Sequence, residues 1–142
     1  MAQSVPSASL IPCLQLVPVD WTVAKVAVNN GRSVITLDHD QAGSGAMVVR
    51  LTAACDLAGA REVSSEQRGA RRYLRIGASS ATRIYTFSGG CVTQRFRAAG
   101  PSELRLSDTA STEFGFITRD ELRQALSQRS DGRLELDPYQ GR

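Results

Sequence analysis

Arginine, cysteine and histidine are the residue types in this 142-residue sequence whose positions suggest chemistry. Arginine supplies almost all of the positive charge, because Lys25 is the only lysine. Residues 67–102 contain seven arginines and no acid, whereas residues 103–137 carry eight acids against five arginines. A guanidinium group binds phosphate and carboxylate oxygens in a bidentate manner. The basic stretch therefore predicts a surface that docks an anionic partner.

Strand periodicity indicates how these arginines could gather on one surface. Within a strand at 91–97, Arg95 and Arg97 share a face, because successive side chains alternate. If Arg75 joins them, the sheet presents a basic stripe suited to a partner protein, an anionic polymer or an anionic lipid surface. Nucleic acid is possible but less favoured, since no segment matches an RNA-recognition consensus. The alternative is a solvated sheet face that the acidic C-terminal region neutralises. The predicted binding residues are Arg71, Arg72, Arg75, Arg83, Arg95 and Arg97.

The cysteines bear on the compartment. Cys55 and Cys91 are expected at strand ends, where a disulfide between them would stabilise the fold by about 3–4 kcal/mol. Alternatively, these two and Cys13 are ordinary buried thiols of a cytosolic protein. A metal site formed by Cys13, His39, Cys55 and Cys91 would have suitable ligands, but their spacing matches no known pattern. The sequence predicts no metal and no cofactor.

The only histidine is the one candidate for acid–base catalysis. His39 lies between Asp38 and Asp40, and a neighbouring carboxylate can orient an imidazole and raise its pKa. Successive strand residues point to opposite faces, however, so a solvated turn cluster is the preferred interpretation. No nucleophile-elbow or phosphate-loop motif is present. The sequence therefore predicts a protein that is not an enzyme and has no catalytic residue.

The secondary structure expected to position these residues is a series of strands, followed along the chain by helices. Asn29-Asn30-Gly31 and Ser88-Gly89-Gly90 are turn sequences between alternating runs, which predicts two hairpins. Residues 62–69 are polar and are expected to form a loop. The predicted strands are residues 22–28, 33–39, 46–53, 71–76, 83–87 and 91–97.

After residue 101 the apolar period becomes helical. Residues 102–114 are one helix candidate. A second helix is better specified: Thr118 and Glu121 fit a capping box, and Gly132 fits its end. Residues 133–137 could add a short last strand. The predicted fold is α+β, an antiparallel sheet of hairpins followed by one or two C-terminal helices, with a flexible segment 1–9, one domain 10–138 and a tail 139–142.

The apolar run at residues 9–19 is about half the ~20 residues that a membrane-spanning helix needs, and prolines break it. Residues 87–96 (FSGGCVTQRF) and 130–138 (SDGRLELDP) resemble soluble portions of uncharacterised envelope-associated membrane proteins of high-GC Gram-positive bacteria. The resemblance covers roughly the C-terminal two-thirds of the chain and implies no catalytic residue. It favours an extracytoplasmic, envelope location over the cytoplasm. The function expected is a non-catalytic binding or accessory domain, with a cytosolic nucleic-acid-associated or assembly subunit as the alternative.

Overall fold

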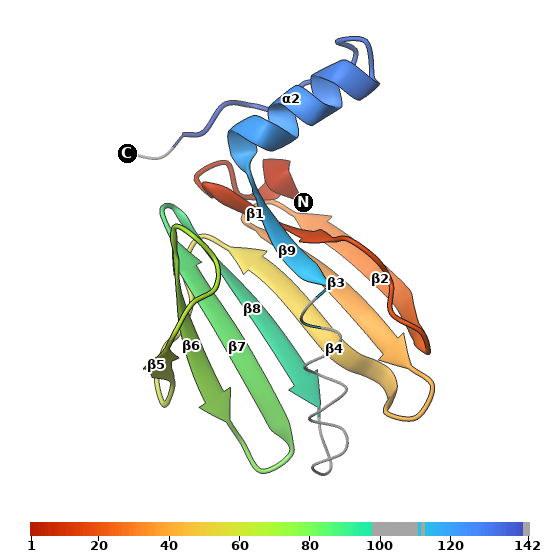
Figure 1. Cartoon of the computed structure of the whole chain (residues 1–142), viewed down its shortest axis with the longest axis vertical. Coiled ribbons are helices and arrows are strands. Elements are labelled where there is room, and N and C mark those ends of the chain that lie inside the picture. The colour runs from red at the N-terminus through yellow and green to blue at the C-terminus, as the bar shows by residue number, and fades with distance from the viewer. Residues whose placement is uncertain (98–110, 112, 141–142) are drawn as a thin grey trace.

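Nine strands and one α-helix make up the part of the chain that the computed structural model describes, residues 1–97, 111 and 113–140 (Figure 1). Seven strands form an antiparallel sheet in the order β2-β3-β4-β8-β7-β6-β5, and β1 pairs with β9 in a second, two-stranded sheet. The predicted α+β class is confirmed. The elements are η1 (Ala2–Ser4), β1 (Leu10–Leu14), β2 (Trp21–Asn29), β3 (Arg32–His39), β4 (Gly43–Thr52), β5 (Arg61–Val63), β6 (Ala70–Ile76), β7 (Ser80–Phe87), β8 (Gly90–Arg97), β9 (Phe114–Thr118) and α2 (Arg119–Arg129).

The six predicted strands correspond to β2, β3, β4, β6, β7 and β8, and both predicted hairpins form. Gly31 turns the first hairpin with φ +80° and Gly89 turns the second with φ +68°, conformations that glycine adopts without a Cβ clash. Three strands were not expected, namely β1, β5 and β9. β1 and β9 pair with each other although they lie far apart in the sequence, and β5 has only three residues. Local periodicity therefore gives little signal for any of these strands.

The connection between β4 and β5 crosses the large sheet. In the sheet order, β8, β7 and β6 lie between these two strands, so residues 53–60 must pass over one face of all three. The connection has eight residues, which reach at most about 26 Å, and four strand spacings amount to about 19 Å. It also contains a turn, closed by a hydrogen bond from the Ala60 N–H to the Leu57 carbonyl (3.0 Å). A disulfide from Cys55 to Cys91 of β8 and a hydrogen bond from Arg75 of β6 to the Asp56 carbonyl (2.7 Å) hold it against the sheet.

The two-stranded sheet covers the other face. β1 and β9 cross in front of the large sheet, and α2 lies beyond one end of it (Figure 1). Ile11 of β1 and Phe114 of β9 join the apolar core with buried residues of β3, β4, β7 and β8. We call the covered side of the large sheet the front face and the opposite side the back face. The front face carries the buried side chains Ile35, Leu37, Met47, Val49, Leu51, Tyr85, Val92 and Phe96.

Part of the N-terminal segment, residues 1–9, packs into the core. Ala2, Val5 and Ala8 are buried in the core cluster. Their carbonyl oxygens accept hydrogen bonds from the guanidinium of Arg119, which is 1% exposed and also donates to the Asp137 carbonyl. Burial lowers the pKa of Arg119. We call this meeting point of both chain ends the terminal hub.

Helix α2 begins as the sequence predicts. The Thr118 side chain accepts a hydrogen bond from the backbone N–H of Glu121, and the Glu121 carboxylate accepts one from the backbone N–H of Thr118. The helix ends before Gly132, whose φ is +75°. The other helix candidate, residues 102–114, falls mainly outside the described residues, and its last residue, Phe114, begins β9. Residues 133–137, predicted to form a strand, form none.

Candidate anion-binding face

The back face of the large sheet carries most of the basic side chains of the strands. Register assigns residues to faces, because directly paired residues point to the same side. Cys91 and Arg95 alternate with the core residues Val92 and Phe96, so they point to the back. Two acidic strand residues, Asp38 and Glu62, point the same way, and the crossover adds Asp56. Seven basic residues of the strands point to the back: Lys25, Arg32, Arg50, Arg71, Arg75, Arg95 and Arg97.

Three of these cations lie in one row across six strands. The paired residues are Lys25, Thr36, Val48, Arg95, Thr82 and Arg75, from β2 to β6. Adjacent strands are about 4.8 Å apart, which puts Lys25 about 14 Å from Arg95 and Arg95 about 10 Å from Arg75 at the backbone. We call this set the basic row. Arg50 lies in the neighbouring row, opposite Thr93. The spacing suits an extended anionic polymer along β2, β3, β4 and β8. Beyond β8 the crossover lies on the same face, and its Asp56 carbonyl accepts a hydrogen bond from Arg75.

Several back-face arginines are held by the protein itself. Arg71 donates to both carboxylate oxygens of Glu62 (2.9 and 2.6 Å), and these hydrogen bonds lower the pKa of Glu62. Arg97 donates to the carbonyls of Ala42 and Ser44, and so braces the β3–β4 turn. Lys25, Arg32, Arg50 and Arg95 make no hydrogen bond or ion pair with a side chain within the described residues. These four cations are therefore the most available for an external anion.

Two of the six arginines predicted to bind lie on the other face. Arg72 pairs with Tyr85, and Arg83 pairs with Gln94, so both point to the front. Arg72 donates to Glu66 (2.6 Å), and the Tyr85 hydroxyl donates to the other Glu66 oxygen (2.8 Å). The six predicted residues thus do not form one surface. Residue type and parity within one strand do not say how neighbouring strands align, so the sequence does not separate Arg72 and Arg83 from the other four arginines.

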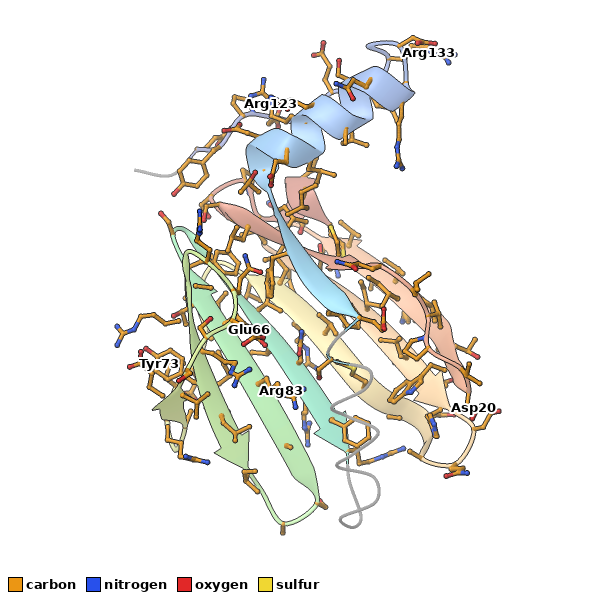
Figure 2. The ribbon with its side chains drawn as sticks, in the orientation of Figure 1. Asp20, Glu66, Tyr73, Arg83, Arg123 and Arg133 are labelled. Atoms are coloured by element: carbon orange, nitrogen blue, oxygen red, sulfur yellow. A yellow bond between two sulfur atoms is a disulfide. The ribbon has the colours of Figure 1, made fainter. Side chains whose placement is uncertain are left out.

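The front-face group forms a polar network in a hollow of about 510 Å³. Two of the residues that line this hollow, Glu66 and Arg83, are labelled in Figure 2. Partial burial opposes ionisation of Glu66, but hydrogen bonds and the charges of Arg72 and Arg83 outweigh it and lower its pKa. Burial, followed by the hydrogen bond to Glu66, raises the pKa of Tyr85. Glu66 already receives both the Arg72 and Tyr85 hydrogen bonds. We therefore assign this network to positioning the loop at residues 64–69.

The predicted disulfide between Cys55 and Cys91 is present, with Cα atoms 5.8 Å apart. It closes a loop with a sequence separation of 36 residues and fixes the crossover to β8. Cys13 is a half-buried free thiol in β1, and burial raises its pKa. A thiol in that environment is a poor nucleophile at neutral pH.

His39 is buried rather than part of a solvated turn, which corrects the preferred interpretation of the sequence. Its ring is 4% exposed and packs edge-on against Trp21, with centroids 4.8 Å apart. The His39 Nδ1 atom accepts hydrogen bonds from the backbone N–H groups of Gln41 and Ala42 (3.1 and 3.2 Å). An acceptor at Nδ1 fixes the neutral tautomer that carries its proton on Nε2. His39 therefore shapes the β3–β4 turn.

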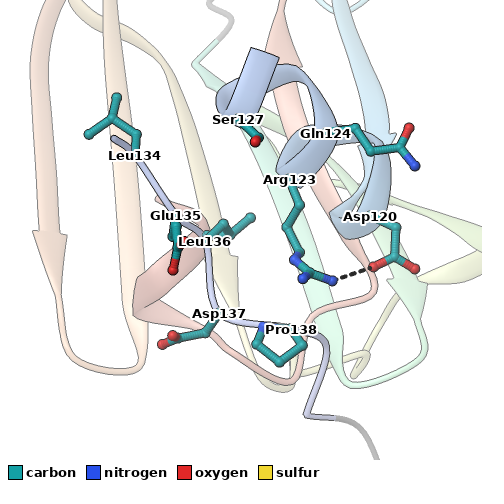
Figure 3. A pocket seen from close by; sticks show the side chains of 9 residues that line it. All are labelled: Asp120, Arg123, Gln124, Ser127, Leu134, Glu135, Leu136, Asp137 and Pro138. Atoms are coloured by element: carbon teal, nitrogen blue, oxygen red, sulfur yellow. Dashed lines mark hydrogen bonds and ion pairs between the residues drawn. The ribbon is translucent and has the colours of Figure 1, made fainter. Parts of the chain in front are cut away.

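A second hollow, of about 660 Å³, separates α2 from the C-terminal tail (Figure 3). Arg123 and Asp120 form an exposed ion pair at its rim (3.5 Å). Glu135 and Asp137 line the tail side, so the charge of this hollow is opposite in sign to that of the back face. It does not extend the basic surface of the back face.

Sequence reasoning missed Lys25, Arg32 and Arg50 as members of the basic surface. The predicted strands contain or adjoin all three residues, so the available signal was their alternation within each strand. Alternation alone leaves the face of each strand undecided until the pairing register is known. No group of three or more His, Cys, Asp or Glu side chains suited to a metal ion occurs in the described portion. Nor does that portion contain a helix long and apolar enough to span a membrane.

No protein-family model, curated protein or solved structure matches this chain significantly.

Proposed function

We propose that this chain is a non-catalytic binding domain whose back face docks an anionic polymer. The observation that carries the proposal is the basic row, in which Lys25, Arg95 and Arg75 are aligned across six strands. An array of cations fixed on a rigid sheet gains affinity by releasing counterions from a polyanion. Guanidinium groups add bidentate hydrogen bonds to phosphate or sulfate oxygens.

The positions of the aromatic residues favour a polymer that is not recognised through stacked bases. Proteins that bind single-stranded nucleic acid stack bases on exposed aromatic rings. Among the described strand residues of the back face, only Tyr73 is aromatic, and Arg71 lies over its ring at 5.8 Å. Trp21, Tyr85 and Phe96 are buried on the front. A polyphosphate-like or acidic envelope polymer therefore fits better than nucleic acid, which stays the second candidate.

The disulfide supports a location outside the reducing cytosol. Disulfides persist in secreted and envelope proteins, whereas cytosolic thiols are kept reduced. We accordingly propose an extracytoplasmic place for the domain. Mass mapping of the protein from its native cells, without reductant, should find Cys55 and Cys91 in one crosslinked peptide pair. Free thiols at both positions would sink the envelope assignment.

Binding of long-chain polyphosphate tests the proposed face. The variant Lys25→Gln/Arg50→Gln/Arg95→Gln removes three cations that hold no other described side chain. Its apparent affinity should fall at least tenfold at low salt, and its salt dependence should flatten by about 0.7 in the log–log slope for each phosphate that the variant no longer neutralises. Titration by fluorescence anisotropy at several salt concentrations measures both.

A matched variant removes the same number of charges elsewhere. Arg68, Arg123 and Arg129 are exposed and lie off the back face, so changing all three to glutamine should leave most of the affinity. Equal reductions in both triple variants would mean that net charge alone drives binding, which rejects a specific face. Stronger binding of single-stranded DNA than of polyphosphate at equal salt would select the nucleic-acid alternative.

A further inference from the structure

Among the described residues, the large sheet has one long edge without a pairing strand, formed by β2. Strand order puts β2 at one end of the sheet and β5 at the other, and these strands have nine and three residues. A three-residue edge offers little backbone for pairing. By contrast, β2 presents a full strand of N–H and C=O groups on the side away from β3.

The same edge collects exposed apolar side chains. Six of the nine large hydrophobic residues that are exposed in the described chain lie between residues 16 and 28, and three of these six, Val23, Val26 and Val28, belong to β2. Val26 and Val28 are 55% and 53% exposed, and with Val23 they pair with front-face residues of β3. A contiguous apolar patch beside an unpaired strand marks a site of protein association.

The charge of the edge selects the kind of partner. Lys25 points to the back, opposite Thr36, and it is the only charged residue within β2. Beyond it, Arg32 and Arg50 keep the adjoining back surface positive. A β-bulge between Val23 and Lys25 leaves the valines on the front and the lysine on the back.

We propose that β2 receives an extended strand from a partner protein, with apolar residues toward the front and acidic residues toward the back. Backbone hydrogen bonds supply affinity in this mode, and alternate side chains supply specificity. Val23, Val26 and Val28 contact the apolar side of the incoming strand, and Lys25 faces its acids. The site is distinct from the polyanion face, although Lys25 borders both.

Charge disfavours a second copy of the chain as the occupant. Pairing β2 with β2 would set two back faces edge to edge, each with seven basic strand residues against two acidic ones. Like charges across a strand pair are destabilising. An acidic partner strand reverses the sign of that interaction.

Two designed peptides test the inference. Each is nine residues long, capped at both ends and labelled with fluorescein; one alternates valine with glutamate, and the other alternates valine with lysine. The glutamate peptide should bind the intact protein at least tenfold more tightly than the lysine peptide. It should also slow amide hydrogen exchange in β2. Equal affinities, or no protection of β2, would overturn the proposal.

Two substitutions place the site. Val26→Lys puts a charge on the apolar side of the edge and should weaken the glutamate peptide at least tenfold, whereas Ile76→Lys, at an exposed apolar position outside β2, should not. Lys25→Glu should reverse the preference between the peptides. Val26→Lys should not weaken polyphosphate binding, which separates this site from the proposed function. A dimer in sedimentation equilibrium that Val26→Lys dissolves would overturn the acidic partner in favour of a second copy.

Discussion

The terminal hub and the back face use the same residue type in opposite ways. In the hub, Arg119 is 1% exposed and donates four hydrogen bonds to backbone carbonyls of residues far apart in sequence. On the back face, Arg95 is exposed and makes no hydrogen bond or ion pair with a described side chain. A buried guanidinium must satisfy its donors inside the protein, because an unpaired donor there costs free energy. An exposed one keeps them for water or a ligand, so burial separates the structural arginine from the candidate binding arginines.

The largest effect is expected where the back face is covalently fastened. Cys55→Ser removes the disulfide, whose cysteines have a sequence separation of 36. The substitution should lower the free energy of unfolding by about 4 kcal/mol, mostly because the unfolded chain gains entropy. Urea denaturation under oxidising conditions measures this change. Cys13→Ser is the control and should cost much less. A decrease below about 1 kcal/mol for Cys55→Ser would show that the crossover is held by other interactions.

Exchanging arginine for lysine tests the comparison directly. Arg119→Lys keeps the charge but loses the planar fork, leaves carbonyls of the hub unpaired and should cost about 3 kcal/mol. Arg95→Lys should change stability by less than about 0.5 kcal/mol, as for an ordinary surface position. Similar values for the two variants in urea denaturation would contradict the distinction between a structural and an exposed arginine.

Alanine substitutions at two glycines with positive φ distinguish a packing clash with the N-terminal segment from backbone strain in a turn. A Cβ on Gly89 would lie 1.7 Å from the Ser7 carbonyl oxygen, whereas a Cβ on Gly31 meets nothing within 4 Å. Gly31→Ala should cost about 1–2 kcal/mol, the usual strain of a left-handed L-residue. Gly89→Ala should cost at least about 1 kcal/mol more, because a backbone clash displaces segment 1–9. Thermal unfolding of both variants measures the difference, and equal costs would mean that the segment moves aside freely.

The smallest expected effect concerns acid titration at the helix that leaves the hub. Hydrogen bonds from the Thr118 side chain and then its backbone lower the pKa of Glu121. A lowered pKa in the folded state means that ionised Glu121 stabilises the fold fully above its unfolded pKa. That stabilisation is lost as the pH falls through the folded pKa. The melting temperature of the wild type should therefore fall more than that of Glu121→Gln when the pH drops below about 4.3. Parallel pH profiles would show that the capping box contributes nothing through this carboxylate.

Local signals in the sequence determined much of the architecture. Glycine turns defined the hairpins around Gly31 and Gly89, period-two alternation defined six strands, and Thr118 with Glu121 defined the start of α2. Each signal depends on residues a few positions apart, whose conformations are coupled through neighbouring backbone atoms. The α+β class follows from them. The disulfide was predicted from the expected positions of Cys55 and Cys91 at strand ends.

Only the tertiary structure decided which strands are neighbours and which residues share a face. The pairing of β4 with β8, the crossover to β5 and the β1–β9 sheet join residues far apart in sequence, and register then splits the six predicted arginines between two faces. The tertiary structure also decides which polar side chains are buried. His39 and Arg119 are polar in sequence but lie inside, because distant backbone groups or aromatic rings surround them. Long-range packing selects among faces that local chemistry leaves equivalent.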